Sequence, residues 1–85
     1  MNLGLIIREA RVAKGMTQLE LANKLGYESM QFVSLFERGL SKVPHVVIGK
    51  LVVILGINEK TIIKEMATKF QNDLRAEIQK GKEGL

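Results

Sequence analysis

The sequence lacks cysteine and tryptophan and contains only one histidine and one proline. Without cysteine the chain can form neither disulfide bonds nor a thiolate metal site. His45 alone cannot supply the ligands of a metal centre, so we expect no metal and no cofactor. Paired carboxylates, a Ser-His arrangement and a Gly-rich phosphate loop are also missing, which argues against an enzyme.

A long apolar run is missing as well. The longest such stretch, from Val46 to Leu55, is interrupted by Gly49 and Lys50. It falls far short of the roughly 20 residues that a membrane span needs. Basic residues also break up the apolar N-terminus too early for a secretory signal. We therefore expect a soluble, cytoplasmic protein.

The chain carries an excess of positive charge. Its 85 residues include 13 basic and nine acidic side chains, which gives a formal net charge of +4. Such an excess suits a polyanionic partner, because each phosphate that is neutralised releases counterions. Taken alone, this is a weak indication of nucleic-acid binding. The length corresponds to one small domain, and such domains often gain stability by pairing with a second copy.

Helical periodicity dominates the sequence, and strand-like alternation is almost absent. Thr17 and Glu20 form a capping box at the start of one helical segment. Ser29 is the expected N-cap of the next segment, and Pro44 fits the first turn of the one after it. Caps and glycines together divide the chain into five predicted helices, at about residues 3–14, 18–25, 30–38, 44–55 and 58–80. The expected fold class is an all-α five-helix bundle.

The fifth predicted helix is the longest, at about 20 residues or roughly 30 Å. Its apolar residues recur every four positions, at Ile62, Met66, Phe70, Leu74 and Ile78. We accordingly divide the chain into three parts. Residues 1–57 form a domain of four helices, residues 58–80 form a C-terminal helix that packs on this domain and is a candidate for dimerisation, and residues 81–85 form a flexible tail.

The pattern between residues 17 and 39 is typical of a helix-turn-helix. Two helices that cross steeply need a small residue where their backbones approach, and Ala22 supplies it. The tight turn between them needs a positive φ, which Gly26 adopts without steric cost. Val33 and Phe36 are predicted to face inward. The side that a recognition helix presents to the major groove then carries Met30, Gln31, Ser34 and Leu35.

Two stretches carry a family resemblance. The sequences IREARVAKGMTQLELANKLG and VSLFERG resemble the lambda-repressor and Cro type of helix-turn-helix domain, also called the XRE family. The resemblance covers residues 6–57 and implies a lambda-repressor-like fold that binds double-stranded DNA. The family pattern is one residue shorter between Gly26 and Gly39. Its recognition helix also usually carries polar or basic residues where this chain has Met30 and Leu35.

The resemblance implies roles for individual residues. Gln18 would donate to a DNA phosphate at a helix N-terminus. Gln31 would read a base edge, since glutamine can pair with adenine N6 and N7. Ser34 would contact a base or a phosphate, and Arg11 would form a structural ion pair with Glu37. The expected DNA-binding set is completed by Thr17, Met30, Leu35, Arg38, Ser41 and Lys42.

The fourth predicted helix is apolar nearly all round, and a helix of this kind must be buried. Val53 and Ile54 stand where the family has polar or small residues. We expect them to form a homodimer interface together with Ile57 and parts of the fifth helix. The alternative is that the fifth helix folds back and covers them within one chain. A two-fold dimer would place two recognition helices roughly 34 Å apart and read a palindrome.

The preferred function is a dimeric transcription repressor that binds an operator and blocks polymerase by steric overlap. Among DNA-binding proteins there are two alternatives. One is an antitoxin that binds a toxin through its fourth or fifth helix, and the other is the controller protein of a restriction-modification system. An alternative of another class is a protein-interaction module that has lost DNA binding. The apolar residues Met30, Phe32 and Leu35 favour that last hypothesis.

Overall fold

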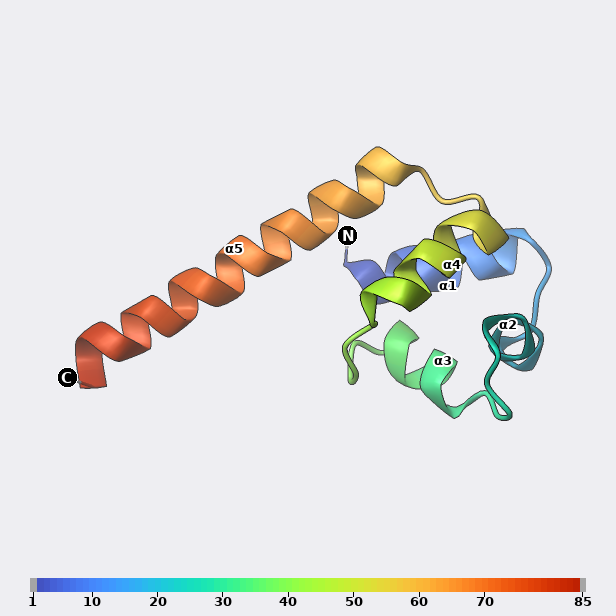
Figure 1. Ribbon diagram of the computed structural model, residues 1–85, viewed down its shortest axis with the longest axis horizontal. Helices are drawn as coiled ribbons and strands as arrows, with labels where there is room; N and C mark the ends of the chain where they lie inside the picture. Colours follow the sequence, from blue (N-terminus) through green and yellow to red (C-terminus); the bar gives the residue numbers. More distant parts are fainter. Residues whose placement is uncertain (1, 85) are drawn as a thin grey trace.

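The computed structural model describes residues 2–84 and divides them among five helices and their connections. The helices are α1 (Leu3–Ala13), α2 (Gln18–Leu25), α3 (Gln31–Glu37), α4 (His45–Leu55) and α5 (Glu59–Gly84). Helices α1 to α4 cluster together, whereas α5 leaves the cluster as a single rod (Figure 1). This rod makes the molecule elongated, with dimensions of 48 × 26 × 19 Å. The predicted all-α five-helix fold is confirmed.

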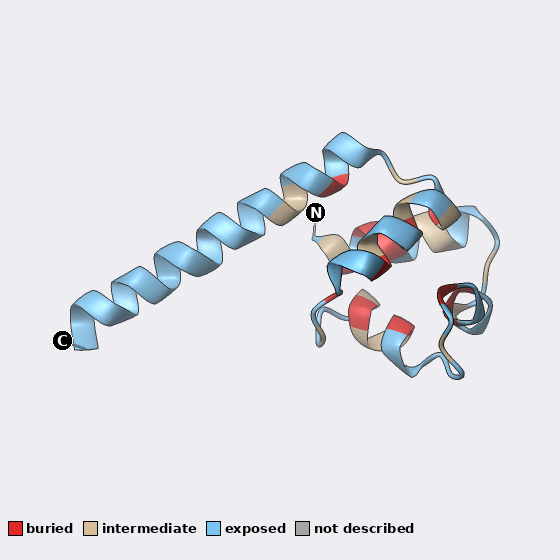
Figure 2. Cartoon of the chain, in the orientation of Figure 1, coloured by how far each residue is buried: buried red, intermediate tan, exposed pale blue. Residues whose placement is uncertain are grey.

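The hydrophobic core lies between the first four helices, on the sides that face one another (Figure 2). Helix α1 contacts α3 and α4, and α2 contacts the same two helices. Val33 and Phe36 of α3 are buried, as their spacing predicts, and so is Ala22 of α2. Apolar side chains of α1, α2 and α4 are fully or almost fully buried in the same core: Ile7, Leu21, Leu25, Val47, Leu51 and Leu55.

The helix-turn-helix begins at the predicted capping box. The Thr17 hydroxyl oxygen accepts a hydrogen bond from the Glu20 N–H at 3.1 Å, and the Glu20 carboxylate accepts one from the Thr17 N–H at 3.2 Å. Gly26 ends α2 with a φ of 90°, in the left-handed region that glycine adopts without strain. The predicted start and end of α2 are therefore confirmed.

The next two helices begin later than the sequence predicts. Helix α3 starts at Gln31, with Met30 in the cap position and no side-chain cap. Ser29 is thus not the N-cap, although its hydroxyl oxygen accepts a long hydrogen bond, 3.4 Å, from the Gln31 N–H. The extra residue of the turn is absorbed before α3. Pro44 likewise precedes α4, because its ψ of 146° is extended rather than helical.

Gly4 lets α1 approach the end of α3 closely. A Cβ atom at this position would lie 2.5 Å from the Glu37 carbonyl oxygen and 2.7 Å from that of Phe36. Both are backbone atoms, which cannot rotate away. The helical pattern of α1 gives no sign of this contact, because it depends on where α3 ends in space.

Helix α5 begins where it is predicted, directly after Asn58, but it ends later and packs less on the domain than expected. The predicted tail after residue 80 is helical as far as Gly84, and the Gln79 amide donates to Glu83 one turn later at 3.1 Å. A single glycine such as Gly81 costs a helix only about 1 kcal/mol, which is too little to end it. At the other end only the first turns pack on the domain, and Ile62 is the one buried residue of the described helix. Most of α5 therefore does not pack on the domain.

Within residues 2–84 no helix combines the length and the apolar character that crossing a membrane requires.

Candidate nucleic-acid interface

Helix α3 presents one face to the solvent. Val33 and Phe36 point into the core. The outer face is formed by the residues on the opposite side of the helix, which are spaced three or four positions apart. This outer face consists of Gln31, Ser34, Leu35 and, just after the helix, Arg38. Gln31 and Arg38 are exposed, whereas Ser34 and Leu35 are half-buried. Met30 lies in the turn before α3 and therefore flanks this face.

An aromatic cluster fixes the long turn to α3. The rings of Tyr27 and Phe32 are stacked with their centroids 5.1 Å apart, and Phe36 lies 6.1 to 6.3 Å from both. Aromatic pairs of this kind contribute roughly 0.5–1.5 kcal/mol beyond the area that they bury. Phe32 is exposed, and its packing on Tyr27 gives it a structural role in the turn.

A bidentate ion pair joins α1 to the end of α3. Arg11 Nε lies 2.6 Å from Glu37 Oε2, and Arg11 Nη2 lies 3.1 Å from Oε1. Arg11 Nη1 donates to the Met16 carbonyl oxygen at 2.8 Å. The side chains of Arg11 and Glu37 are only 12% and 3% exposed. Hydrogen bonding to Glu37 raises the pKa of Arg11 above its ordinary value, against the lowering effect of burial. The expected structural pair is confirmed.

Gln18 joins this ion pair. Its Nε2 donates to Glu37 Oε1 at 3.1 Å, which ties the first residue of α2 to the last residue of α3. Within residues 2–84 the second N–H and the carbonyl oxygen of the Gln18 amide have no protein partner. The sequence does not reveal this link, because 19 positions separate the two residues. The helical pattern around either residue gives no information about its distance from the other.

The N-terminus of α2 lies beside this cluster. The first backbone N–H groups of a helix have no intrahelical acceptor. The Thr17 hydroxyl oxygen caps the N–H of Glu20. In the described part of the chain, the backbone N–H groups of Gln18 and Leu19 make no hydrogen bond. Partial positive charge at a helix N-terminus favours an anion there. The Thr17 hydroxyl oxygen is already used as the cap.

The residues after α3 lie in an exposed loop. Arg38 Nε donates to the Ser34 carbonyl oxygen at 3.3 Å, which holds the guanidinium over the end of α3. The Ser41 hydroxyl donates to the Lys42 carbonyl oxygen at 3.4 Å. Ser41 is half-buried and Lys42 is exposed. The loop also borders a groove against Met66 and Phe70 of α5.

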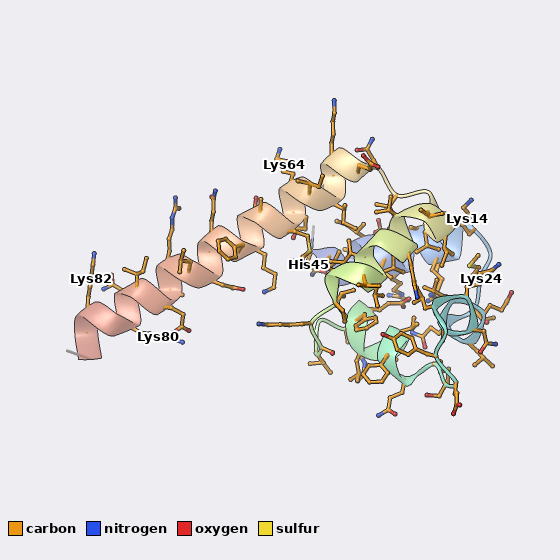
Figure 3. All side chains as sticks on the ribbon, viewed as in Figure 1. Lys14, Lys24, His45, Lys64, Lys80 and Lys82 are labelled. Atoms are coloured by element: carbon orange, nitrogen blue, oxygen red, sulfur yellow. The ribbon has the colours of Figure 1, made fainter. Side chains whose placement is uncertain are left out.

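Positive charge is concentrated in the helical cluster. Residues 1–57 carry seven basic and four acidic side chains, whereas residues 59–84 carry six and five. Figure 3 shows Lys14 and Lys24 at the end of the molecule opposite Lys80 and Lys82. Residues 1–57 therefore carry most of the net positive charge of the chain.

The three residues predicted for a dimer interface differ in their surroundings. Val53 is 82% exposed on α4. Ile54 and Ile57 are half-buried and pack against the core. Helix α5 does not cover Val53, so the alternative in which it folds back over this residue is wrong. The expectation that α4 is buried on all sides is therefore not met within one chain, although the helix is apolar nearly all round.

A family model described as helix-turn-helix matches residues 7–62, well over half of the chain. The chain belongs to the helix-turn-helix family. This membership confirms the resemblance to the lambda-repressor and Cro type, and the protein is a DNA-binding transcription regulator. Comparison with curated proteins finds no match.

Solved structures of regulators resemble this helix-turn-helix protein. The restriction-modification controller protein C.AhdI from Aeromonas hydrophila is 39% identical over 66% of this chain and 80% of its own, with a TM-score of 0.60. The clp gene regulator ClgR from Corynebacterium glutamicum is 27% identical over 91% and 81%, with a TM-score of 0.65. A chain of the SinR–SinI complex is 25% identical over 93% and 81%, with a TM-score of 0.62.

Proposed function

We propose that this regulator is a dimeric repressor that reads a palindromic operator through α3 and has no catalytic activity of its own. The observation that carries the proposal is the outer face of α3. Gln31 and Arg38 are exposed on it, and the buried Arg11–Glu37 pair fixes the end of the helix. Rigid anchoring of this kind is what direct readout of base edges needs, because the contacts are short and directional.

The proposed contacts divide into phosphate and base contacts. The N-terminus of α2, with Thr17, Gln18 and the free backbone N–H groups of Gln18 and Leu19, would hold a phosphate on one side of the groove. After α3, phosphates on the other side would be held by Arg38, Ser41 and Lys42. Base edges would be met by Gln31 and Ser34, and thymine methyl groups by Leu35 and the flanking Met30.

Gln31→Ala should cost about 1–3 kcal/mol of binding free energy on the preferred operator and little on random DNA, because it removes a base contact. Fluorescence anisotropy with both duplexes measures the difference. Asn72→Ala, at an exposed amide side chain of α5, is the matched control and should change neither affinity. Equal losses on the operator and on random DNA would refute a readout role for Gln31.

The dimer is supported by apolar surface that one chain leaves uncovered. Phe70 is 68% exposed on α5, and Ile63, Leu74 and Ile78 are also exposed. At 100° per residue these four side chains fall within about 90° of one another around the helix. They continue a groove between α4 and α5 that is lined by His45, Ile48, Ile62, Ile63, Met66, Ala67 and Phe70. Monomers rarely leave such a continuous apolar face open.

The charges of α5 suit pairing with a second copy. Basic and acidic residues are nearly balanced along it, so two α5 helices do not repel strongly. An antiparallel pair centred near Phe70 would place Ile63 opposite Ile78 and the small Ala67 opposite Leu74. We therefore propose that α5, together with Val53 of α4, forms the dimer interface.

Leu74→Glu should weaken dimerisation at least about 100-fold, because it buries an unpaired charge in each half of the interface. Sedimentation equilibrium should show a wild-type dimer and a variant monomer at micromolar concentration. Asn72→Glu adds the same charge to the opposite side of α5 and should leave the dimer intact. A monomeric wild-type protein would contradict the proposed dimer. The apolar face of α5 would then be open to a different protein, which is what the antitoxin alternative requires.

A narrower second candidate is a restriction-modification controller. The 39% identity to C.AhdI, over 80% of that chain, supports it. The genes beside this one test the proposal directly. A neighbouring endonuclease and methyltransferase would support control of such a system, and unrelated neighbours would contradict it.

A further inference from the structure

The Glu37 carboxylate serves two partners through one oxygen. Glu37 Oε1 accepts from Arg11 Nη2 at 3.1 Å and from Gln18 Nε2 at 3.1 Å. We propose that Glu37 is a positioning residue, which orients the Gln18 amide for a DNA phosphate while Arg11 holds Glu37 in place. The inference rests on the proposed phosphate contact of Gln18 and assigns the buried ion pair a role in DNA binding besides its structural one.

Hydrogen-bonding chemistry makes this orientation selective. A free glutamine amide can rotate so that either its oxygen or its NH₂ group points outward. The outward oxygen would meet a phosphate as a second acceptor, which is unfavourable. An ionised carboxylate only accepts hydrogen bonds, so Glu37 selects the orientation in which Nε2 faces it. The second N–H of Gln18 then points away from Glu37 and is available to an anion.

Arg11 neutralises the negative charge of Glu37, which lies close to the proposed phosphate site. An isolated carboxylate near a phosphate site would repel DNA, and it would do so more strongly when buried, where screening by salt is weak. The bidentate pair with Arg11 neutralises that charge. Preorganisation of the Gln18 side chain also spares the cost of ordering it when DNA binds. Arg11 and Glu37 together therefore supply a fixed, neutral support under the Gln18 amide.

The double variant Arg11→Met/Glu37→Met isolates the orientation effect. It removes both charges, so the net charge of the protein is unchanged, and replacing a buried ion pair by apolar residues of similar volume is often tolerated. Thermal unfolding checks the fold. A random-sequence 20-base-pair duplex is the probe, in a fluorescence anisotropy titration. Gln18→Ala and the double variant should each bind this duplex about tenfold more weakly. The triple variant Arg11→Met/Glu37→Met/Gln18→Ala should bind no more weakly than the double variant.

The outcomes separate this inference from the proposed function. Wild-type affinity in the double variant, together with a loss in Gln18→Ala, would overturn the positioning role alone. Wild-type affinity in Gln18→Ala would overturn the phosphate contact and the inference with it. NMR of the side-chain amides in the wild-type protein keeps the test independent of how the double variant folds. The Gln18 amide signals should be shifted from those of the exposed Gln31, and coincident signals would overturn the inference.

Discussion

Arg11→Ala should destabilise the protein by about 3–5 kcal/mol, because it leaves the buried carboxylate of Glu37 without its counter-ion. The side chain of Glu37 is 3% exposed, so water has little access to replace the guanidinium. The Met16 carbonyl oxygen loses its donor as well. A loss of this size is a large part of the total stability of a small domain, which is about 5–15 kcal/mol. Unfolding in urea, followed by circular dichroism, measures it.

The matched control for Arg11→Ala is an exposed ion pair. Lys69 and Asp73 on α5 lie 3.4 Å apart, and both side chains are 63% exposed. Lys69→Ala should therefore change the free energy of unfolding by less than about 1 kcal/mol. If Arg11→Ala cost no more than this control, the buried pair would not be the anchor of α3.

Gly4→Ala should destabilise the protein by about 1–3 kcal/mol, close to the upper end of that range. The added Cβ would meet backbone atoms of Phe36 and Glu37, so α1 or the end of α3 must move. Because α3 carries the proposed base contacts, operator affinity should fall together with stability. Differential scanning calorimetry and a titration with the operator measure the two effects.

Gly49→Ala is the control for Gly4→Ala. Gly49 also lies inside a helix, but a Cβ added there meets no atom within 4 Å. Alanine is a better helix former than glycine by about 1 kcal/mol, so this variant should be more stable than the wild type. Opposite signs for the two substitutions are expected. Stabilisation by Gly4→Ala would show that α1 and α3 are not in close contact.

Local signals in the sequence account for most of the fold. The capping box of Thr17 and Glu20 sets the start of α2, and Gly26 sets its end. The spacing of Val33 and Phe36 identifies the inner face of α3 and thereby its outer face, since the helical period relates the two. The start of α3 was not predictable to the residue, because the turn has one additional residue and Tyr27 and Phe32 determine how it packs.

Contacts between distant parts of the chain could not be read from these signals. The bond from Gln18 to Glu37 and the approach of α1 at Gly4 both depend on how three helices meet in space. No periodicity within one helix encodes such a contact. The apolar composition of α4 likewise indicates that Val53 needs a cover but does not say which surface supplies it. The DNA-binding roles of the individual residues remain predictions.

Selection of bound sequences from a random DNA pool by the wild-type protein tests the central claim most directly. A dimeric repressor predicts enrichment of a palindrome whose two half-sites are centred about one turn of DNA apart, roughly 34 Å or 10 base pairs. Enrichment of a single half-site without a partner would contradict the dimer. Failure to enrich any sequence would contradict the reading of an operator by α3.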